Sequence, residues 1–111
     1  MPGDNTNAGP ANYCPRQPAL FPLGRIVATP AALTALKYAG TSLFILLERH
    51  QRGDFGDLGR EDEKSNRDAI RSGARLLSTY TVGTTAVWLI TEAADGWGTR
   101  SSTCLLLPEE Y

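Results

Sequence analysis

The only histidine of the chain, His50, is the side chain best suited to proton transfer near neutral pH. It stands near the end of an apolar segment and four residues before Asp54, so it could act as a general acid or base. The alternative is a structural histidine at a helix end, bonded to terminal carbonyls. A mechanism of phosphodiester cleavage that requires two histidines is excluded.

Arginine and hydroxyl side chains gather around the ends of the predicted strands. Arg100, Ser101 and Thr103 surround the start of the last strand, whereas Arg71 and Arg75 lie where a helix meets the sheet. Arginines beside hydroxyls can hold a phosphate through charge-assisted hydrogen bonds. Exposed arginines without a ligand are the alternative.

These two sets combine into one catalytic hypothesis. The order of the predicted elements, helices followed by a meander, resembles that of small ribonucleases of the barnase and RelE-toxin type; this resemblance implies that His50 or Glu92 would move protons, and that Arg75 and Arg100 would stabilise the charge of the phosphorane. The sequence therefore predicts catalytic roles for His50, Glu92 and Arg100. It predicts substrate-binding roles for a second set of side chains: Arg71, Arg75, Ser101 and Thr103.

Three aspartates lie in or just after the loop RGDFGDLG, residues 52–59. Asp54, Asp57 and Asp62 are candidate ligands for a hard cation such as magnesium or calcium. Their spacing does not match a calcium-binding EF-hand loop. Aspartates that cap turns and the following helix explain the pattern more simply, so no metal and no cofactor are predicted.

Aromatic residues in loops are the candidate contacts with another protein. Phe55 and Trp97 both lie in glycine-containing loops, and we predict that they form an interface. The C-terminal Glu-Glu-Tyr would add to that interface. Trp88, in contrast, is predicted to be a core residue by strand alternation.

Three segments that precede the last third of the chain have the signals of helices. Thr29 and Pro30 begin the first, which Gly40 ends. A second helix runs from residue 41 or 42 to about residue 51 with a broad apolar face. The third, polar and with a narrow apolar stripe, is predicted over residues 61–72.

The last third of the chain is typical of β-structure. Residues 75–82, 86–92 and 101–107 are rich in β-branched, aromatic and aliphatic side chains and are separated by glycine-containing turns. An additional strand or extended segment is predicted over residues 21–28. The sequence predicts an α+β fold, in which two or three short helices pack on a three- to four-stranded antiparallel sheet that ends in a C-terminal meander.

Composition limits the class of protein. The chain has 111 residues, 41% of them hydrophobic and 21% charged, which predicts one globular domain over residues 21–111 after a flexible tail over residues 1–20. The net charge of −1 provides no long-range attraction for nucleic acid. Cys14 and Cys104 have no zinc-site spacing, and no secretory signal or membrane span is evident, which predicts a cytoplasmic protein with free thiols.

Several segments together resemble a family of small proteobacterial proteins carried on plasmids, phages and integrative elements. These segments are LGRIVATPAAL, RHQRGDFGDL with the later Asp62 and Asn66, GARLLSTY, WLITEA and TRSSTCLLLPEEY. Members are labelled plasmid-related, or mislabelled as a type I restriction subunit. The chain departs from the family pattern at Phe55 (for tryptophan), at Thr99 (for aspartate) and by an insertion at residues 94–98. The resemblance implies an accessory protein of a mobile element and no particular activity.

Two functions are consistent with these features. The order of helices followed by a meander is similar to that of small ribonucleases of the barnase and RelE-toxin type, which favours a role with RNA or DNA. The alternative is a non-enzymatic inhibitor or adaptor that binds a host protein complex, of the anti-restriction or anti-CRISPR type. Neither function involves a membrane.

Overall fold

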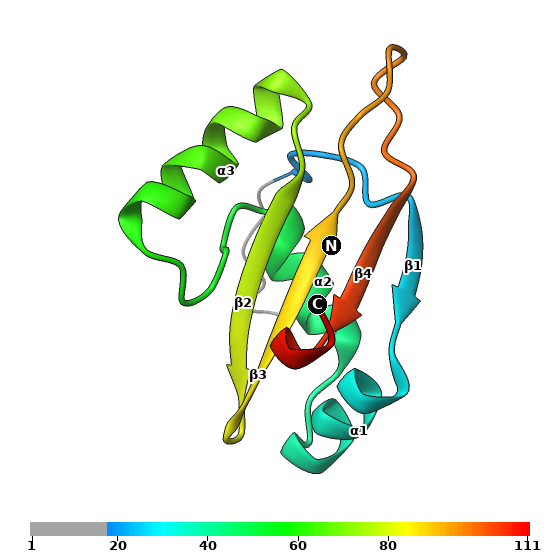
Figure 1. Ribbon diagram of the computed structural model, residues 1–111, viewed down its shortest axis with the longest axis vertical. Coiled ribbons are helices and arrows are strands. Elements are labelled where there is room, and N and C mark those ends of the chain that lie inside the picture. The colour runs from blue at the N-terminus through cyan, green and yellow to red at the C-terminus, as the bar shows by residue number, and fades with distance from the viewer. Residues whose placement is uncertain (1–17) are drawn as a thin grey trace, which may run out of the picture.

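The computed structural model describes residues 18–111, which form a four-stranded sheet, three helices and a short C-terminal turn (Figure 1). Most of the predicted tail, with Cys14, lies outside the described residues. At its described end, the Leu20 amide donates to the Gln51 carbonyl at 2.8 Å. In chain order the elements are β1 (Arg25–Ala28), α1 (Pro30–Ala39), α2 (Leu43–Gln51), α3 (Arg60–Ser72), β2 (Leu76–Val82), β3 (Thr85–Thr91), β4 (Ser102–Leu106) and the 3-10 turn η1 (Pro108–Glu110).

The strands are arranged in the order β1-β4-β3-β2. β2, β3 and β4 pair antiparallel, which confirms the predicted meander. β1 pairs with β4 in parallel, so the sheet is mixed where a wholly antiparallel one was predicted. Parallel pairing is possible because the three helices form a long connection between β1 and the meander, whereas a short turn joins only antiparallel neighbours.

Gly24 allows β1 to approach β4. It has a φ of 67°, and a Cβ atom at this position would lie only 2.3 Å from the carbonyl oxygen of Arg100. A side chain here would therefore push the start of β1 away from the sheet.

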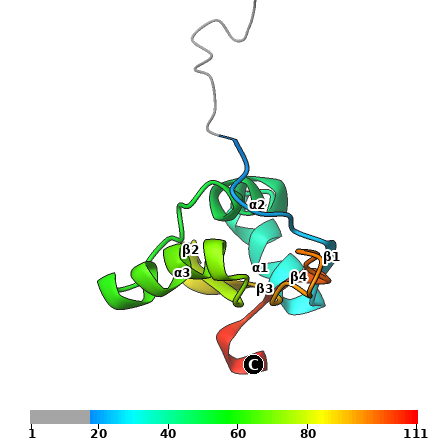
Figure 2. The same cartoon turned by 90° about the horizontal axis from the view of Figure 1, so that it is seen from above.

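The helices α1 and α2 cover one face of the sheet, as predicted, and the C-terminal turn lies on the other side (Figure 2). Thr29 caps α1 by accepting from the Ala32 amide at 3.1 Å, and Gly40 ends it with a φ of 70°. The core between helices and sheet consists of Ala32, Leu36, Leu46, Leu47, Tyr80, Val82, Val87, Leu89 and Leu105. The amphipathic pattern of the two helices therefore positions them by burial of their apolar faces.

The polar helix α3 flanks the outer edge of β2 (Figure 1). It buries only Asn66 and Ala69, which confirms the predicted narrow stripe. Ala69 packs with Phe21, Phe55 and Leu76 in a second cluster. This second cluster is smaller than the first.

Within residues 18–111, no helix alone has the length and apolarity needed to cross a membrane. Only α1 and α2 taken together meet the criteria of length and composition, and they are bent by 101° where they meet.

Candidate functional site

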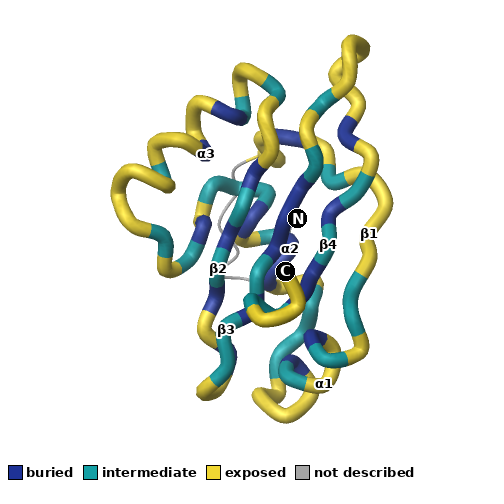
Figure 3. Tube along the Cα trace, in the orientation of Figure 1, coloured by how far each residue is buried: buried dark blue, intermediate teal, exposed yellow. Residues whose placement is uncertain are grey.

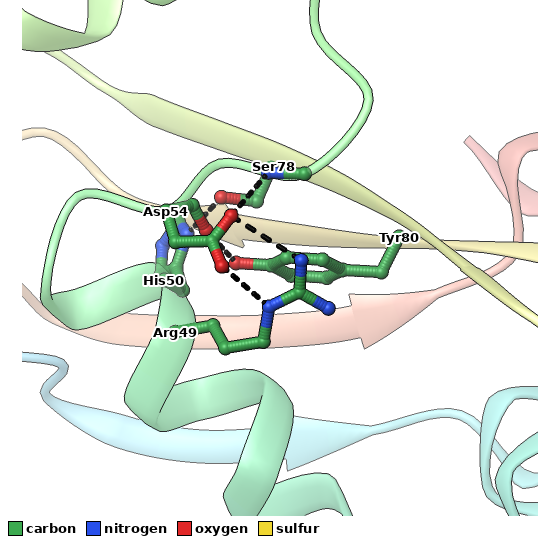
Figure 4. Close-up of polar contacts among 6 residues, drawn as sticks. Arg49, His50, Asp54, Ser78 and Tyr80 are labelled. Atoms are coloured by element: carbon green, nitrogen blue, oxygen red, sulfur yellow. Dashed lines mark hydrogen bonds and ion pairs between the residues drawn. The ribbon is translucent and has the colours of Figure 1, made fainter.

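His50 lies near the C-terminal end of α2 (Figure 4). Its side chain is completely buried. Its Nδ1 atom is 2.5 Å from Ser78 Oγ, and its Nε2 atom is 2.8 Å from Thr91 Oγ1. Thr91 Oγ1 lies 2.7 Å from Thr103 Oγ1, which donates to the carbonyl of Leu23 at 2.7 Å. A chain of hydrogen bonds thus crosses the sheet from β2 to the segment before β1.

The carbonyl at one end of this chain determines the direction of each bond from Leu23 to Nε2 of His50. Thr103 has one proton and gives it to Leu23, so it must accept the proton of Thr91. Thr91 in turn accepts from Nε2–H of His50. Nδ1 bonds to Ser78 and accepts its proton when the ring is neutral, so both ring nitrogens are bonded.

The electrostatics of this position also favour the neutral ring. Burial lowers the pKa of His50 from 6.5 to about 4, and the positive charge of Arg100 contributes in the same direction. A buried histidine bonded on both sides has no contact with solvent. The arrangement favours a structural role over the predicted acid–base role, and the same holds for the hydroxyl of Thr103.

Arg100 is also buried, with 3% of its surface exposed. Its Nη1 atom donates to the carbonyls of Ala74 and Glu92 at 2.8 and 3.0 Å, and its Nη2 atom donates to that of Ala69 at 3.1 Å. Desolvation lowers the pKa of the guanidinium from its usual value. Its charge is placed against the carbonyl end of α3, where the helix dipole is negative, so the geometry favours a structural clamp.

The other predicted phosphate ligands do not converge on one place. Arg71 is exposed and lies 3.5 Å from Asp68, whereas Arg75 donates to the hydroxyl of Tyr111 at 2.9 Å. Ser101 is exposed. Only Arg71 and Arg100 line a common hollow, of about 250 Å³.

Glu92, the second predicted proton carrier, is half-buried. Its amide donates to the carbonyl of Ser102 at 3.0 Å, and its carbonyl accepts from Arg100. Both ring nitrogens of His50 bond to other side chains, those of Ser78 and Thr91, rather than to Glu92. Their joint catalytic role stays a prediction.

Two of the three candidate aspartates, Asp54 and Asp57, have separate structural partners, and the third lies on α3. Asp54 forms two hydrogen bonds with Arg49, at 2.7 and 3.3 Å, and this contact holds the pKa of its carboxyl below the usual value (Figure 4). Asp57 accepts from the hydroxyl of Thr81 at 2.8 Å. Asp62 lies on the exposed first turn of α3. Over the described part of the chain, no group of three or more potential metal ligands occurs.

Phe55 is buried, with 1% of its surface exposed, and the prediction that it forms an exposed contact is wrong. The loop lies beside β2 and bonds to it through the main chain. The amide of Thr79 donates to the carbonyl of Phe55, and the carbonyl of Thr79 accepts from the amide of Asp57. Gly56 permits this close approach, since a Cβ atom there would lie 1.9 Å from the carbonyl oxygen of Thr79. The ring of Phe55 therefore turns inward, 6.2 Å from that of His50.

Trp97, the other predicted contact, has 93% of its surface exposed. It lies in the loop of residues 94–99 between β3 and β4, which projects beyond the sheet (Figure 1). One carboxylate oxygen of Asp95 accepts from the amides of Trp97 and Thr99 at 2.8 and 2.9 Å. Main-chain bonds between Asp95 and Thr99 and between Gly98 and Asp95 close the turn.

These hydrogen bonds hold the main chain at Trp97 in a defined conformation. Hydrogen bonds from the amides of Thr99 and Trp97 lower the pKa of the Asp95 carboxyl, because they stabilise its ionised form. We refer to residues 94–99 as the Trp97 loop. It presents a large apolar side chain to solvent on an ordered backbone.

Comparison with known proteins leaves the site to be argued from its geometry. No family model, no curated protein and no solved structure matches the chain. The resemblance to proteins of mobile elements therefore stays a prediction.

Sequence reasoning missed two features of the exposed surface. Asp95 was not recognised as the organiser of the Trp97 loop, although an aspartate two residues before the tryptophan is the spacing of an Asx turn. Phe44 was predicted to lie on the mostly buried apolar face of the second helix, which is wrong, and Tyr38 and Ile45 were not singled out; the exposed fractions of Tyr38, Phe44 and Ile45 are 87%, 70% and 52%. No sequence signal separated them from the buried face of the same helices.

Proposed function

We propose that this chain is a non-enzymatic binding module that recognises another protein through the Trp97 loop. The observation that carries the proposal is the 93% exposure of Trp97 on a turn closed by Asp95. Tryptophan is enriched among the residues that dominate binding energy at protein interfaces. Because the loop is already ordered, binding would require little further loss of backbone entropy.

The positions of three predicted site residues, two catalytic and one substrate-binding, support a binding role. His50, Arg100 and Thr103 are buried, and each is hydrogen-bonded to other parts of the chain. Removal of these side chains would leave buried partners unsatisfied, so their presence is explained by stability alone.

The charges around Trp97 favour a protein over a nucleic acid. Sites that stack single-stranded bases on aromatic rings combine those rings with a positively charged groove. The only charged side chain of the Trp97 loop is the carboxylate of Asp95. Several basic side chains elsewhere are paired with carboxylates: Arg49, Arg52, Lys64 and Arg71.

The partner we propose is a folded host protein with an apolar pocket large enough for an indole ring. The resemblance to accessory proteins of mobile elements directs the search to host defence complexes. Affinity capture with the tagged full chain, with and without nuclease, followed by mass spectrometry, would identify the partner. Its affinity would then be measured with purified proteins.

Trp97→Ala should weaken this binding by about 2 kcal/mol, roughly a 30-fold rise in Kd. Tyr38→Ala is the matched control, since it removes another exposed aromatic ring, on α1 at the far end of the sheet from the Trp97 loop (Figure 1). We expect the control to bind as the wild type does. Equal binding by Trp97→Ala, or capture of nucleic acid that nuclease abolishes, would contradict the proposal.

A further inference from the structure

Within residues 18–111, the two edge strands of the sheet differ in how far other segments cover their outward backbone groups. At β2, the main chain of the 52–59 loop bonds to both backbone groups of Thr79, at 3.2 and 2.8 Å. The side-chain amide of Asn66 bonds to both backbone groups of Leu77, at 2.5 and 3.2 Å. These contacts close the edge of β2 against a further strand.

The edge of β1 has no comparable cover among residues 18–111. The amides of Arg25 and Thr29 donate toward β4, to Ser101 and Leu105, each at 3.0 Å. By strand alternation, Ile26 and Ala28 therefore direct their N–H and C=O groups outward.

The side chains of β1 are exposed for the same reason. Ile26 and Val27 point to opposite faces of the sheet by strand alternation, and each has 44% of its surface exposed. Figure 3 shows that much of β1 is exposed. A strand added at this edge would cover both of them, whereas a ligand on one face would cover only one.

We propose that β1 pairs antiparallel with β1 of a second copy of the chain, giving a continuous sheet with four strands from each copy. Val27 lies on the two-fold axis, opposite Val27 of the second copy. Ile26 then lies opposite Ala28 of the second copy, and each such pair exchanges two backbone hydrogen bonds. Arg25, the only charged residue of β1, falls opposite Thr29, so no like charges meet.

The fold favours a second copy over an unrelated extended segment because pairing of two β1 strands leaves no open sheet edge to which a further chain could add. Each end of the joined sheet is a β2 edge, protected by Asn66 and the 52–59 loop. The assembly therefore stops at two chains, as a two-fold contact requires. The contact is small, so the dimer should dissociate on dilution.

Sedimentation velocity over concentrations from ~1 µM to ~1 mM tests the assembly. The wild-type chain should pass from monomer to dimer in this range. Val27→Lys and Val27→Glu should each be monomeric, because like charges would meet on the axis. An equimolar mixture of the two should form dimers again, since Lys then lies opposite Glu; this rescue is specific to the proposed register.

Ile26→Pro removes an outward N–H and leaves the hydrogen bonds between β1 and β4 in place, so it should also abolish the dimer. Far-UV circular dichroism and thermal unfolding would show that each variant keeps its fold. Trp97→Ala should dimerise as the wild type does, which separates this proposal from the one for the Trp97 loop. A wild type that stays monomeric throughout, Val27→Lys dimers as stable as wild-type dimers, or a Lys and Glu mixture that stays monomeric would overturn it.

Discussion

At the scale of single residues, the hydroxyls around His50 are expected to stabilise the fold. Thr91→Val keeps the shape of the side chain but leaves Nε2–H of His50 without an acceptor, and removes the donor to Thr103. We expect a loss of about 2 kcal/mol in the free energy of unfolding. Thr79→Val, on the other face of the sheet and half-buried, should change it by less than about 0.5 kcal/mol. Urea unfolding of both variants measures the difference, and equal losses would contradict the assigned network.

The pKa of His50 predicts how stability depends on pH. It is about 4 in the folded protein against 6.5 in an ordinary site, so between these values the unfolded chain binds more protons than the folded one. This contribution to stability is complete above pH 6.5 and is lost as the pH falls toward 4. It amounts to about 3 kcal/mol.

Urea unfolding from pH 7.5 to 4 would measure this loss in the wild type and in His50→Gln. Carboxylates titrate in both proteins, so only the difference between the two curves reports on the histidine. The wild type should lose about 3 kcal/mol more than the variant over this range. Parallel curves would show that His50 is not held neutral by burial.

At the scale of elements, Asn66 is expected to join α3 to β2. Its side-chain amide donates to the carbonyl of Leu77, an edge residue of the sheet, and accepts from the amide of Leu77. Asn66→Ala should lower the free energy of unfolding by about 2 kcal/mol and increase hydrogen exchange at the Leu77 amide. Arg67→Ala, an exposed neighbour on α3, is the control and should leave this amide protected. Unchanged protection of Leu77 in Asn66→Ala would mean that α3 is held by its apolar stripe alone.

The carboxylate of Asp95 accepts two of the hydrogen bonds that close the Trp97 loop. Asp95→Ala should speed hydrogen exchange at the amides of Trp97 and Thr99, which both donate to that side chain. It should weaken partner binding although the indole remains, because the loop would no longer be ordered before it binds. The Trp88 amide, within β3, is the internal control. If Asp95→Ala lost no affinity, exposure of the indole rather than its fixed position would explain binding.

At the scale of the whole molecule, Arg100 connects parts of the chain that are distant in sequence. It bonds to the carbonyls of Ala69, Ala74 and Glu92 and lies over the ring of Phe21, 5.7 Å from its centroid. Arg100→Met should lower the free energy of unfolding by about 3 kcal/mol, because three carbonyls lose a buried donor.

Arg71→Ala is the matched control for Arg100, since Arg71 lines the same hollow but is exposed. Thermal unfolding should show a lower midpoint for Arg100→Met and almost no change for the control. An Arg100→Met variant as stable as the wild type would contradict the structural role of Arg100 and favour a role in ligand binding instead.

The sequence predicted the elements well and the site only in part. Local signals were sufficient for the helix ends, as Thr29 and Gly40 show, and for the meander. The roles of His50 and Phe55 were not predictable from residue type, because each depends on groups far along the chain. Ser78 and Thr91 contact His50 only when the sheet is assembled. The same holds for the contact between Thr79 and Phe55.

Strand and helix periodicity, caps and turn residues are properties of neighbouring residues, and for this reason the sequence by itself determined the α+β class and the order of its elements. Whether a polar side chain is buried and bonded, or exposed and available, depends on contacts between segments that are distant in sequence. Tertiary structure alone decided that His50 and Arg100 are bonded in the interior, and that of the two predicted contacts Phe55 is buried while Trp97 faces solvent. It also decided that β1 is parallel to β4 and lies at an open edge, since pairing partners are chosen by the packing of the whole sheet.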